Sequence, residues 1–222
     1  MQSIKNMSEK KVTIIDYNLG NLYSVKQACD VLGIDATISA NIADVERADA
    51  LILPGVGAFI EAMNNLNELQ LVQPILAASM QKKPIFGICL GLQLLFSASE
   101  EFGSGEGLGL ISGMVKKFPS ESKDKKVKVP QIGWNTVYKA IQGWDNSPLR
   151  EIEQKDFMYF VHSYYVQPFD EQVVLTKTNY EGIEYCSSIL YKNIFATQFH
   201  PEKSADKGLS IYKNWALINN LL

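Results

Sequence analysis

Short apolar runs that alternate with helical patterns constrain the fold of this chain more than any other feature. The apolar runs occupy residues 12–16, 35–40, 50–53 and 84–88, and the helical patterns between them cover 22–32, 58–67 and 71–82. This alternation is typical of βαβ units, in which strands run parallel and crossovers are right-handed. The first half of the chain therefore predicts an α/β fold with a central, largely parallel sheet.

The pattern changes after about residue 105, where strand-like segments predominate. They cover 110–118, 127–138, 157–166 and 173–178, followed by a hairpin at 189–195 that runs on to His200, and a closing helix is expected over about 206–221. The sequence shows no internal repeat and no linker rich in Pro, Gly or Ser. We therefore expect additional strands in the second half and a single domain over 12–222, preceded by a disordered polar extension over 1–11.

Composition and charge exclude several classes of protein. A net charge of −3 is unfavourable for a general nucleic-acid binder. No apolar run reaches the roughly 20 residues of a membrane span, and residues 1–11 lack the apolar core of a signal peptide. Cys29, Cys89 and Cys186 are odd in number and form no C-x-x-C pair, so neither a disulfide scaffold nor a metal site is expected. We expect a cytoplasmic protein without a cofactor, with Cys29 and Cys186 as structural residues.

Cys89 is the cysteine that the pattern marks as a nucleophile. The apolar run 84–88 leads into Gly87-Ile88-Cys89-Leu90-Gly91, and an apolar helical pattern follows at once. This strand–turn–helix order is that of a nucleophile elbow, and the N–H groups of the new helix favour a thiolate. Most lone cysteines are simply buried. The two flanking glycines have no evident packing role here, which favours the nucleophile.

The chain has two histidines that could serve as the base, His162 and His200. His200 and Glu202 end a strand-like segment, and residues two apart on an extended chain face the same side. Glu202 is therefore expected to orient the His200 imidazole while that ring faces the sulfur. The alternative is an exposed histidine beside a turn-forming proline. His162 lies in an apolar strand without a nearby carboxylate in the sequence, and it ranks second.

The turn Pro54-Gly55-Val56-Gly57 directly follows a strand-like run. It is not a phosphate-binding Walker loop, because no Gly-Lys-Ser/Thr follows it. The plain interpretation is a tight turn. The functional interpretation is an oxyanion hole, in which a peptide N–H freed by the glycines, at Val56 or Gly57, joins the N–H of Leu90.

Taken together, these blocks resemble the class I (triad) glutamine amidotransferases and, more narrowly, the glutaminase subunits of imidazole glycerol phosphate synthase. The resemblance covers about residues 12–220. The matching blocks, in chain order, are Ile15-Asp16-Tyr17-Asn18-Leu19-Gly20-Asn21, Pro54-Gly55-Val56-Gly57-Ala58-Phe59, Gly87-Ile88-Cys89-Leu90-Gly91-Leu92-Gln93, Val129-Pro130-Gln131-Ile132-Gly133-Trp134-Asn135, Phe160-Val161-His162-Ser163-Tyr164 and Gln198-Phe199-His200-Pro201-Glu202-Lys203-Ser204. The resemblance implies the flavodoxin-like, three-layer fold of this class.

The resemblance also implies the chemistry and the site. Cys89, His200 and Glu202 would form a triad that hydrolyses L-glutamine to glutamate and ammonia. The residues expected to hold glutamine are Gly55, Gly57, Gln93, Ser163 and Tyr164, and Glu101 is placed at its amino group by a looser match. No metal or other cofactor is implied.

A partner follows from the same resemblance. In the family, ammonia passes to a (β/α)₈ cyclase subunit that converts PRFAR to imidazole glycerol phosphate and AICAR in histidine biosynthesis, so a heterodimer is expected. The expected interface residues are Asn21, Trp134, Tyr159 and Lys203, with ordinary core packing as the alternative for Trp134.

One residue departs from the family pattern, which usually reads Pro-His-x-Gly-Trp-Asn, because position 131 is Gln. This departure leaves open a paralogous subunit that supplies ammonia for amidino sugars of surface polysaccharide. A stand-alone cysteine peptidase or γ-glutamyl hydrolase and a catalytically silent subunit are further alternatives. The lysine-rich segment 116–128 is expected to be a solvated loop or hairpin, with a docking edge for an acidic partner as the alternative.

Overall fold

The computed structural model describes residues 10–101, 103–122, 125–141 and 143–222. Its centre is a set of five adjacent parallel strands in the order β2-β1-β3-β4-β16. These strands are β1 (Val12–Ile15), β2 (Ala36–Ser39), β3 (Ala50–Gly55), β4 (Ile85–Cys89) and β16 (Ile194–Thr197). The predicted α/β class with a largely parallel sheet is confirmed.

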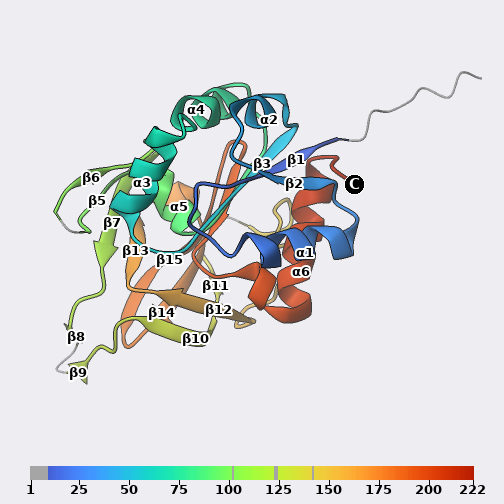
Figure 1. Ribbon diagram of the computed structural model, residues 1–222. Coiled ribbons are helices and arrows are strands. Elements are labelled where there is room, and N and C mark those ends of the chain that lie inside the picture. Colours follow the sequence, from blue (N-terminus) through green and yellow to red (C-terminus); the bar gives the residue numbers. More distant parts are fainter. Residues whose placement is uncertain (1–9, 102, 123–124, 142) are drawn as a thin grey trace, which may run out of the picture.

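Helices cover both faces of the parallel strands (Figure 1). They are α1 (Leu22–Leu32), α2 (Ile42–Arg47), α3 (Phe59–Glu68), α4 (Val72–Met80) and α6 (Ala205–Ile218). The ends of α1 follow local rules, because the Asn21 side chain accepts from the N–H of Ser24 at its start and Gly33 adopts φ +75° at its end.

The continuous apolar runs of the sequence are explained by a core on each side of the sheet. Along β3, Ala50 and Ile52 belong to the cluster that contains α1 and α6, whereas Leu51 and Leu53 belong to the cluster that contains α3 and α4. Successive side chains of a strand point to opposite faces, so a strand covered on both faces must be apolar throughout. The three-layer arrangement predicted from the family resemblance is therefore confirmed.

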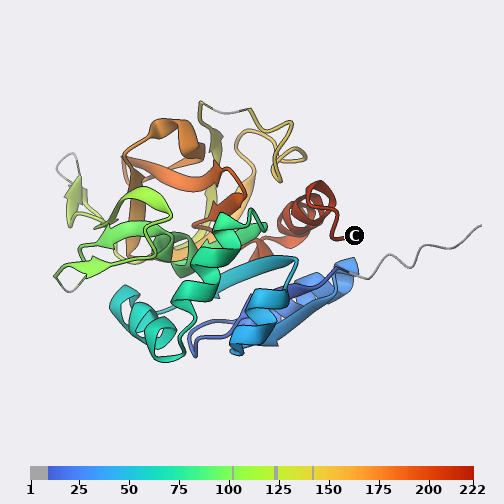
Figure 2. The ribbon, with the colours of Figure 1, turned by 90° about the horizontal axis from the view of Figure 1, so that it is seen from above.

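The second half adds strands that are mostly antiparallel and extend the sheet beyond β16 (Figure 2). They are β5 (Phe96–Ser99), β6 (Gly105–Glu106), β7 (Ile111–Lys117), β11 (Tyr138–Lys139), β13 (Tyr164–Pro168), β14 (Val174–Tyr180) and β15 (Ile183–Tyr191). A short helix, η1 (Glu171–Val173), precedes β14. The expected extra strands are present.

Two small strand pairs stand apart from the main sheet. β10 (Gln131–Thr136) and β12 (Phe157–His162) form an antiparallel ribbon. β8 (Glu121–Ser122) and β9 (Lys125–Lys126) form a short antiparallel pair within the lysine-rich segment.

Several elements differ from the sequence-based prediction. The six-residue α2 and the strand β5 were not predicted. The strand expected over 127–138 is wrong in extent, because β10 covers its centre and β11 pairs with β14 instead. Of the extension expected over 1–11, residues 1–9 lie outside the described residues. None of the helices in the described ranges is long and apolar enough to cross a membrane.

Candidate active site

Three loops meet at the carboxyl ends of the central parallel strands. β3 ends at Gly55 and β4 ends at Cys89, and these two residues are paired in the register of the sheet. β16 lies on the other side of β4 and ends at Thr197, three residues before His200. Ligands of open α/β sheets bind at this edge. The topology thus brings the Pro54–Gly57 turn, Cys89 and His200 together.

Cys89 occupies a sharp and strained turn. Its φ of 55° and ψ of −107° lie outside the regions that non-glycine residues favour. It ends β4 and precedes α5 (Leu90–Leu94), which is only five residues long. This is the geometry of a nucleophile elbow.

The prediction that the flanking glycines have no packing role is wrong. A Cβ at Gly91 would lie 1.7 Å from the carbonyl oxygen of Leu53, and a Cβ at Gly87 would lie 2.9 Å from the Cβ of Ala196. Both glycines are therefore required by close packing between α5, β3 and β16, and the positive φ belongs to Cys89 itself.

His200 and Glu202 form a buried hydrogen-bonded pair. The His200 Nδ1 lies 2.7 Å from the Glu202 Oε1, and both side chains are almost completely shielded from solvent. The expected extended backbone is wrong, because Pro201 begins the short helix η2 (Pro201–Lys203) directly after His200. Burial lowers the pKa of His200, but the nearby Cys89 and the Glu202 carboxylate outweigh it and raise the pKa to about 10. The imidazole is therefore protonated at neutral pH.

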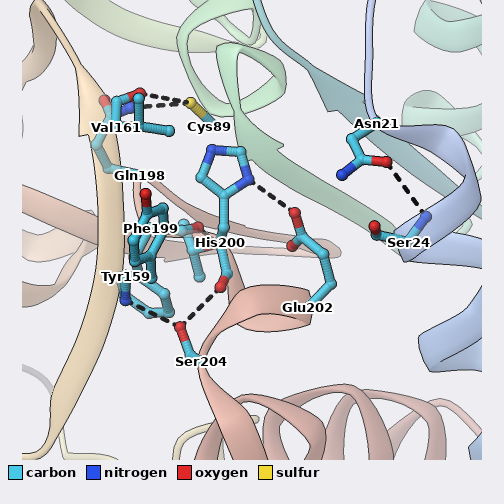
Figure 3. A network of polar contacts seen from close by, with 11 residues as sticks. Asn21, Ser24, Cys89, Tyr159, Val161, Gln198, Phe199, His200, Glu202 and Ser204 are labelled. Atoms are coloured by element: carbon cyan, nitrogen blue, oxygen red, sulfur yellow. Dashed lines mark hydrogen bonds and ion pairs between the residues drawn. The ribbon is translucent and has the colours of Figure 1, made fainter. Parts of the chain in front are cut away.

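Besides the His200 imidazole, two further polar groups lie near the Cys89 sulfur. The Gln198 Nε2 lies 3.7 Å from the sulfur, and the sulfur lies 3.8 Å from the carbonyl oxygen of Val161. The His200 imidazole lies between Glu202 and the sulfur (Figure 3), and its Nε2 is buried without a hydrogen-bond partner among the described residues. Nε2 is thus free to engage the sulfur or a substrate.

The Tyr17 side chain packs against the Pro54–Gly57 turn and supports it. The Tyr17 hydroxyl donates to the carbonyl oxygen of Pro54 at 2.7 Å, and a Cβ at Gly55 would lie 1.8 Å from that hydroxyl. Burial, together with the nearby Cys89, raises the pKa of Tyr17, so the hydroxyl keeps its proton and stays a donor. Gly57 has φ +107°, which a residue with a side chain rarely adopts. The sequence included Tyr17 in a matching block but gave no signal for this role.

A cavity of about 300 Å³ opens beside the sulfur. Its lining contains Val56, Gly57, Cys89, Leu90, Gln93, Glu101, Pro130, Val161, His162, Ser163 and Tyr164. It includes every residue predicted to hold glutamine except Gly55, which is buried against Tyr17. The Glu101 carboxylate is held in place by a hydrogen bond, in which its Oε2 accepts from the N–H of Phe59 at 2.6 Å.

His162 lines the same cavity, but its Nδ1 already donates to a backbone carbonyl and its Nε2 is covered by Tyr185. Nδ1 lies 2.8 Å from the carbonyl oxygen of Tyr164, and Nε2 lies 3.3 Å from the hydroxyl of Tyr185. Burial lowers the pKa of His162 to about 3. The ring is therefore neutral and occupied at neutral pH, which favours His200 as the base.

The β10–β12 ribbon carries an exposed apolar face. The register pairs Trp134 with Tyr159, and the side chains of a directly opposed pair lie on the same face. Trp134 is 53% exposed, and its ring meets that of Tyr159 edge-on at 6.0 Å. Ile132 and Phe157 are also exposed on this ribbon, and the Lys203 ammonium lies 5.9 Å from the Tyr159 ring. Ordinary core packing of Trp134, the alternative interpretation, is wrong.

Hydrogen bonds connect the ribbon to the His200 loop. The His200 N–H donates to the carbonyl oxygen of Tyr159 at 2.9 Å. The hydroxyl of Ser204 accepts from the Tyr159 N–H at 3.0 Å and donates to the His200 carbonyl oxygen at 2.7 Å (Figure 3). Sequence reasoning assigned no role to Ser204 or to Gln198, because both roles depend on contacts between distant segments.

The fold and the site define a class of protein. The sequence profile of the glutamine amidotransferase class-I family matches residues 13–218, and the chain belongs to this family. The fold agrees with solved structures of low sequence identity. The structure of PurLQS from Thermotoga maritima is 16% identical with a TM-score of 0.70, covering 94% of this chain and 98% of that one. The glutaminase domain of Trypanosoma brucei CTPS with bound acivicin is 18% identical with a TM-score of 0.63, covering 94% of each chain.

Within this class, the chain is similar to imidazole glycerol phosphate synthase subunits. The subunit HisH of Aquifex aeolicus is 47% identical over 206 residues, which cover 92% of this chain and 95% of that protein. The subunit HisH of Geobacter metallireducens is 43% identical over 208 residues, which cover 93% and 97%. The family resemblance drawn from the sequence is therefore confirmed.

Proposed function

We propose that this protein is a glutaminase subunit that hydrolyses L-glutamine and passes the ammonia to a (β/α)₈ cyclase in histidine biosynthesis. The observation that carries the proposal is the hydrogen-bonded His200–Glu202 pair beside Cys89, at the edge of the cavity of about 300 Å³. The names of the similar subunits, the lack of a membrane-spanning helix in the described ranges and the three free cysteines support a cytoplasmic synthase complex.

The reaction divides into two steps. The Cys89 thiolate attacks the side-chain carboxamide carbon of glutamine, and the protonated His200 gives its proton to the nitrogen as the C–N bond breaks and ammonia leaves. The neutral imidazole then takes a proton from water, and the resulting hydroxide attacks the γ-glutamyl thioester. Cleavage of the C–S bond releases glutamate and restores the thiolate. Glu202 holds the imidazole by its Nδ1 throughout.

The negative oxygen formed in each step needs donors. The N–H of Leu90 follows the nucleophile directly, as in other nucleophile elbows. The second donor is an N–H of the neighbouring turn, at Val56 or Gly57, and the positive φ of Gly57 allows that peptide to reorient. Gln93, Ser163 and Tyr164 line the cavity, which supports the proposal that they hold the substrate.

The apolar face of the β10–β12 ribbon is the proposed docking surface for the cyclase, with Trp134, Tyr159, Lys203 and Asn21 at the interface. The position of Gln131 bears on the identity of the partner. Its side chain is buried on the opposite face of the ribbon, opposite His162 in register, and its Oε1 accepts from the Tyr185 hydroxyl at 3.0 Å. Gln131 therefore lies outside the proposed docking face, which supports the histidine-pathway cyclase over the partner of an amidino-sugar paralogue.

Partner control is part of the proposal. β12 contributes Tyr159 to the docking face, and the Val161 carbonyl of the same strand lies against the Cys89 sulfur. A partner that docks on this face thus presses on a strand that contacts the site. We expect the free subunit to be nearly inactive and docking to reorient the Gly55–Gly57 turn.

The test is glutamine hydrolysis by the purified chain, with and without the cyclase subunit. Hydrolysis should rise strongly when the cyclase is present, and Cys89→Ala should abolish it while leaving docking intact. Cys186→Ala is the matched control, because it removes a buried sulfur outside the site and should keep the activity. Full turnover by Cys89→Ala would refute the mechanism. Equal rates with and without the cyclase would refute the proposal that the partner controls the activity. Release of glutamate from γ-glutamyl peptides by the chain alone would favour the γ-glutamyl hydrolase.

A further inference from the structure

Gln198 is a fully buried polar residue that the triad chemistry does not use. Its side chain is 0% exposed, and it follows β16 two residues before His200. Its backbone N–H donates to the carbonyl oxygen of Ser187 at 2.9 Å, which anchors it to β15. Both ends of its side-chain amide are engaged, the oxygen with Gln93 at 3.1 Å and the nitrogen with the Cys89 sulfur at 3.7 Å.

The direction of these hydrogen bonds follows from a fixed acceptor. The carbonyl oxygen of Tyr164 can only accept, and it lies 3.0 Å from the Gln93 side-chain nitrogen. That contact sets the NH₂ group of Gln93 toward Tyr164, and its second hydrogen reaches the Gln198 oxygen. The Gln198 amide must then turn its own NH₂ toward Cys89. A backbone carbonyl thus determines, through two amides, that the sulfur faces a donor.

We propose that Gln198 donates to the Cys89 thiolate and that Gln93 orients this donor, so that the pair stabilises the negative sulfur. An N–H that points at sulfur favours the anion over the neutral thiol. The inference rests on the proposed function for its meaning, since it describes the same nucleophile. The proposal adds Gln198 as a residue that keeps the Cys89 sulfur negatively charged and correctly oriented. Gln93 and Tyr164 line the cavity, so the same chain of amides connects the substrate site to the sulfur.

Alkylation of Cys89 by iodoacetamide measures this effect without glutamine. The thiolate displaces iodide, forming a C–S bond as the C–I bond breaks, so the rate follows the thiolate fraction. The other two cysteines give little background, because burial raises the pKa of Cys29 to about 12 and raises that of Cys186 as well. Cys89→Ala reports the remaining background.

The decisive variant is Gln198→Met, which keeps the length of the side chain and removes the donor. The midpoint of the alkylation–pH profile should move up by about one pH unit, as expected for one hydrogen bond to an anion, which makes alkylation about tenfold slower below the midpoint. Gln93→Met should move the midpoint less, and the double variant should match Gln198→Met, because Gln93 acts through Gln198. Gln73→Met, an exposed site on α4, is the matched control.

The titratable groups beside the sulfur and in the cavity are the same in every variant, so the difference between profiles isolates the amide; they are His200, Glu202, Tyr17, His162 and Glu101. A folded Gln198→Met whose midpoint equals that of the wild type would overturn the proposal. Fully additive shifts in the double variant would overturn the orienting role of Gln93. A shifted profile in a chain that never hydrolyses glutamine would leave the proposal standing and refute the proposed function instead.

A second measurement uses the unaltered residue, in case Gln198→Met does not fold. In protein with ¹⁵N-labelled glutamine side chains, the Gln198 NH₂ resonance should titrate with the midpoint of the alkylation profile. That titration should disappear in Cys89→Ala. A Gln198 resonance that does not change over this pH range in the wild type would overturn the proposal.

Discussion

His162 should make the stability of the folded protein depend on pH in a window that few other groups affect. Burial lowers its folded-state pKa to about 3, whereas the value for an unfolded chain is about 6.5. Between these values the unfolded chain binds a proton that the folded chain does not, so the free energy of unfolding falls as the pH falls. At about 1.4 kcal/mol per pH unit, the loss between pH 6.5 and pH 5 is about 2 kcal/mol.

The second histidine does not compensate in this window. The pKa of His200 is raised to about 10, so His200 is protonated in both states below pH 6.5 and its contribution is lost only as the pH rises toward 10. The test is urea denaturation at pH 7 and pH 5, followed by tryptophan fluorescence, for the wild type and His162→Gln.

His162→Gln should be less stable than the wild type at pH 7, because it loses packing and the hydrogen bond to the carbonyl oxygen of Tyr164. It should nevertheless lose about 2 kcal/mol less than the wild type between the two pH values. The contribution of the carboxylates to the pH dependence of stability cancels in this comparison, because the carboxylates are the same in both proteins. Parallel losses in the two proteins would refute the assignment of this pH dependence to His162.

Three further predictions follow from packing and exposure. Trp134→Ala should weaken cyclase binding by about 2 kcal/mol or more in calorimetry, because exposed aromatic anchors dominate interfaces. It should leave the free energy of unfolding nearly unchanged. The control Phe169→Ala, which removes an exposed aromatic residue elsewhere, should bind the cyclase normally. Gly91→Ala should not fold to the native state in circular dichroism, because its Cβ would lie 1.7 Å from the Leu53 carbonyl oxygen; a native-like melting curve would contradict this. Ser204→Ala removes a buried hydroxyl with two hydrogen bonds and should cost about 1–3 kcal/mol in urea denaturation; an unchanged midpoint would contradict it.

The sequence predicts the parallel half well because the signals there are local. β1, β3 and β4 are buried on both faces, so an apolar run and the turn that ends it lie within a few residues, as for Ala50–Gly55. The short helix α2 has too few residues for its periodicity to stand out. β5 begins two residues after α5 ends, within one apolar stretch that fits a helix or a strand equally well.

The candidate site shows the same division between local and distant signals. The meeting of His200 and Glu202 is predictable because they lie two residues apart, although a turn of η2 rather than a strand brings them together. The contact between Gln93 and Gln198 spans 105 residues of sequence, and no pattern within either segment indicates it. The support of the Pro54 turn by Tyr17 is hidden for the same reason, at a separation of 37 residues.

The β10–β12 ribbon connects the proposed docking face to the Cys89 sulfur, because one of its faces is exposed and the other is buried. Trp134 and Tyr159 point outward, while Gln131 and His162 are buried beneath them. The backbone of β12 meets the site at two points, at the Cys89 sulfur through Val161 and at the His200 N–H through Tyr159. Protein interiors are close-packed and do not deform continuously, so a shift of the exposed face is transmitted through these contacts. If the proposed partner docks on this face, we expect these contacts to move the sulfur, and the Gln198 amide would have to follow that movement to keep its contact with the sulfur.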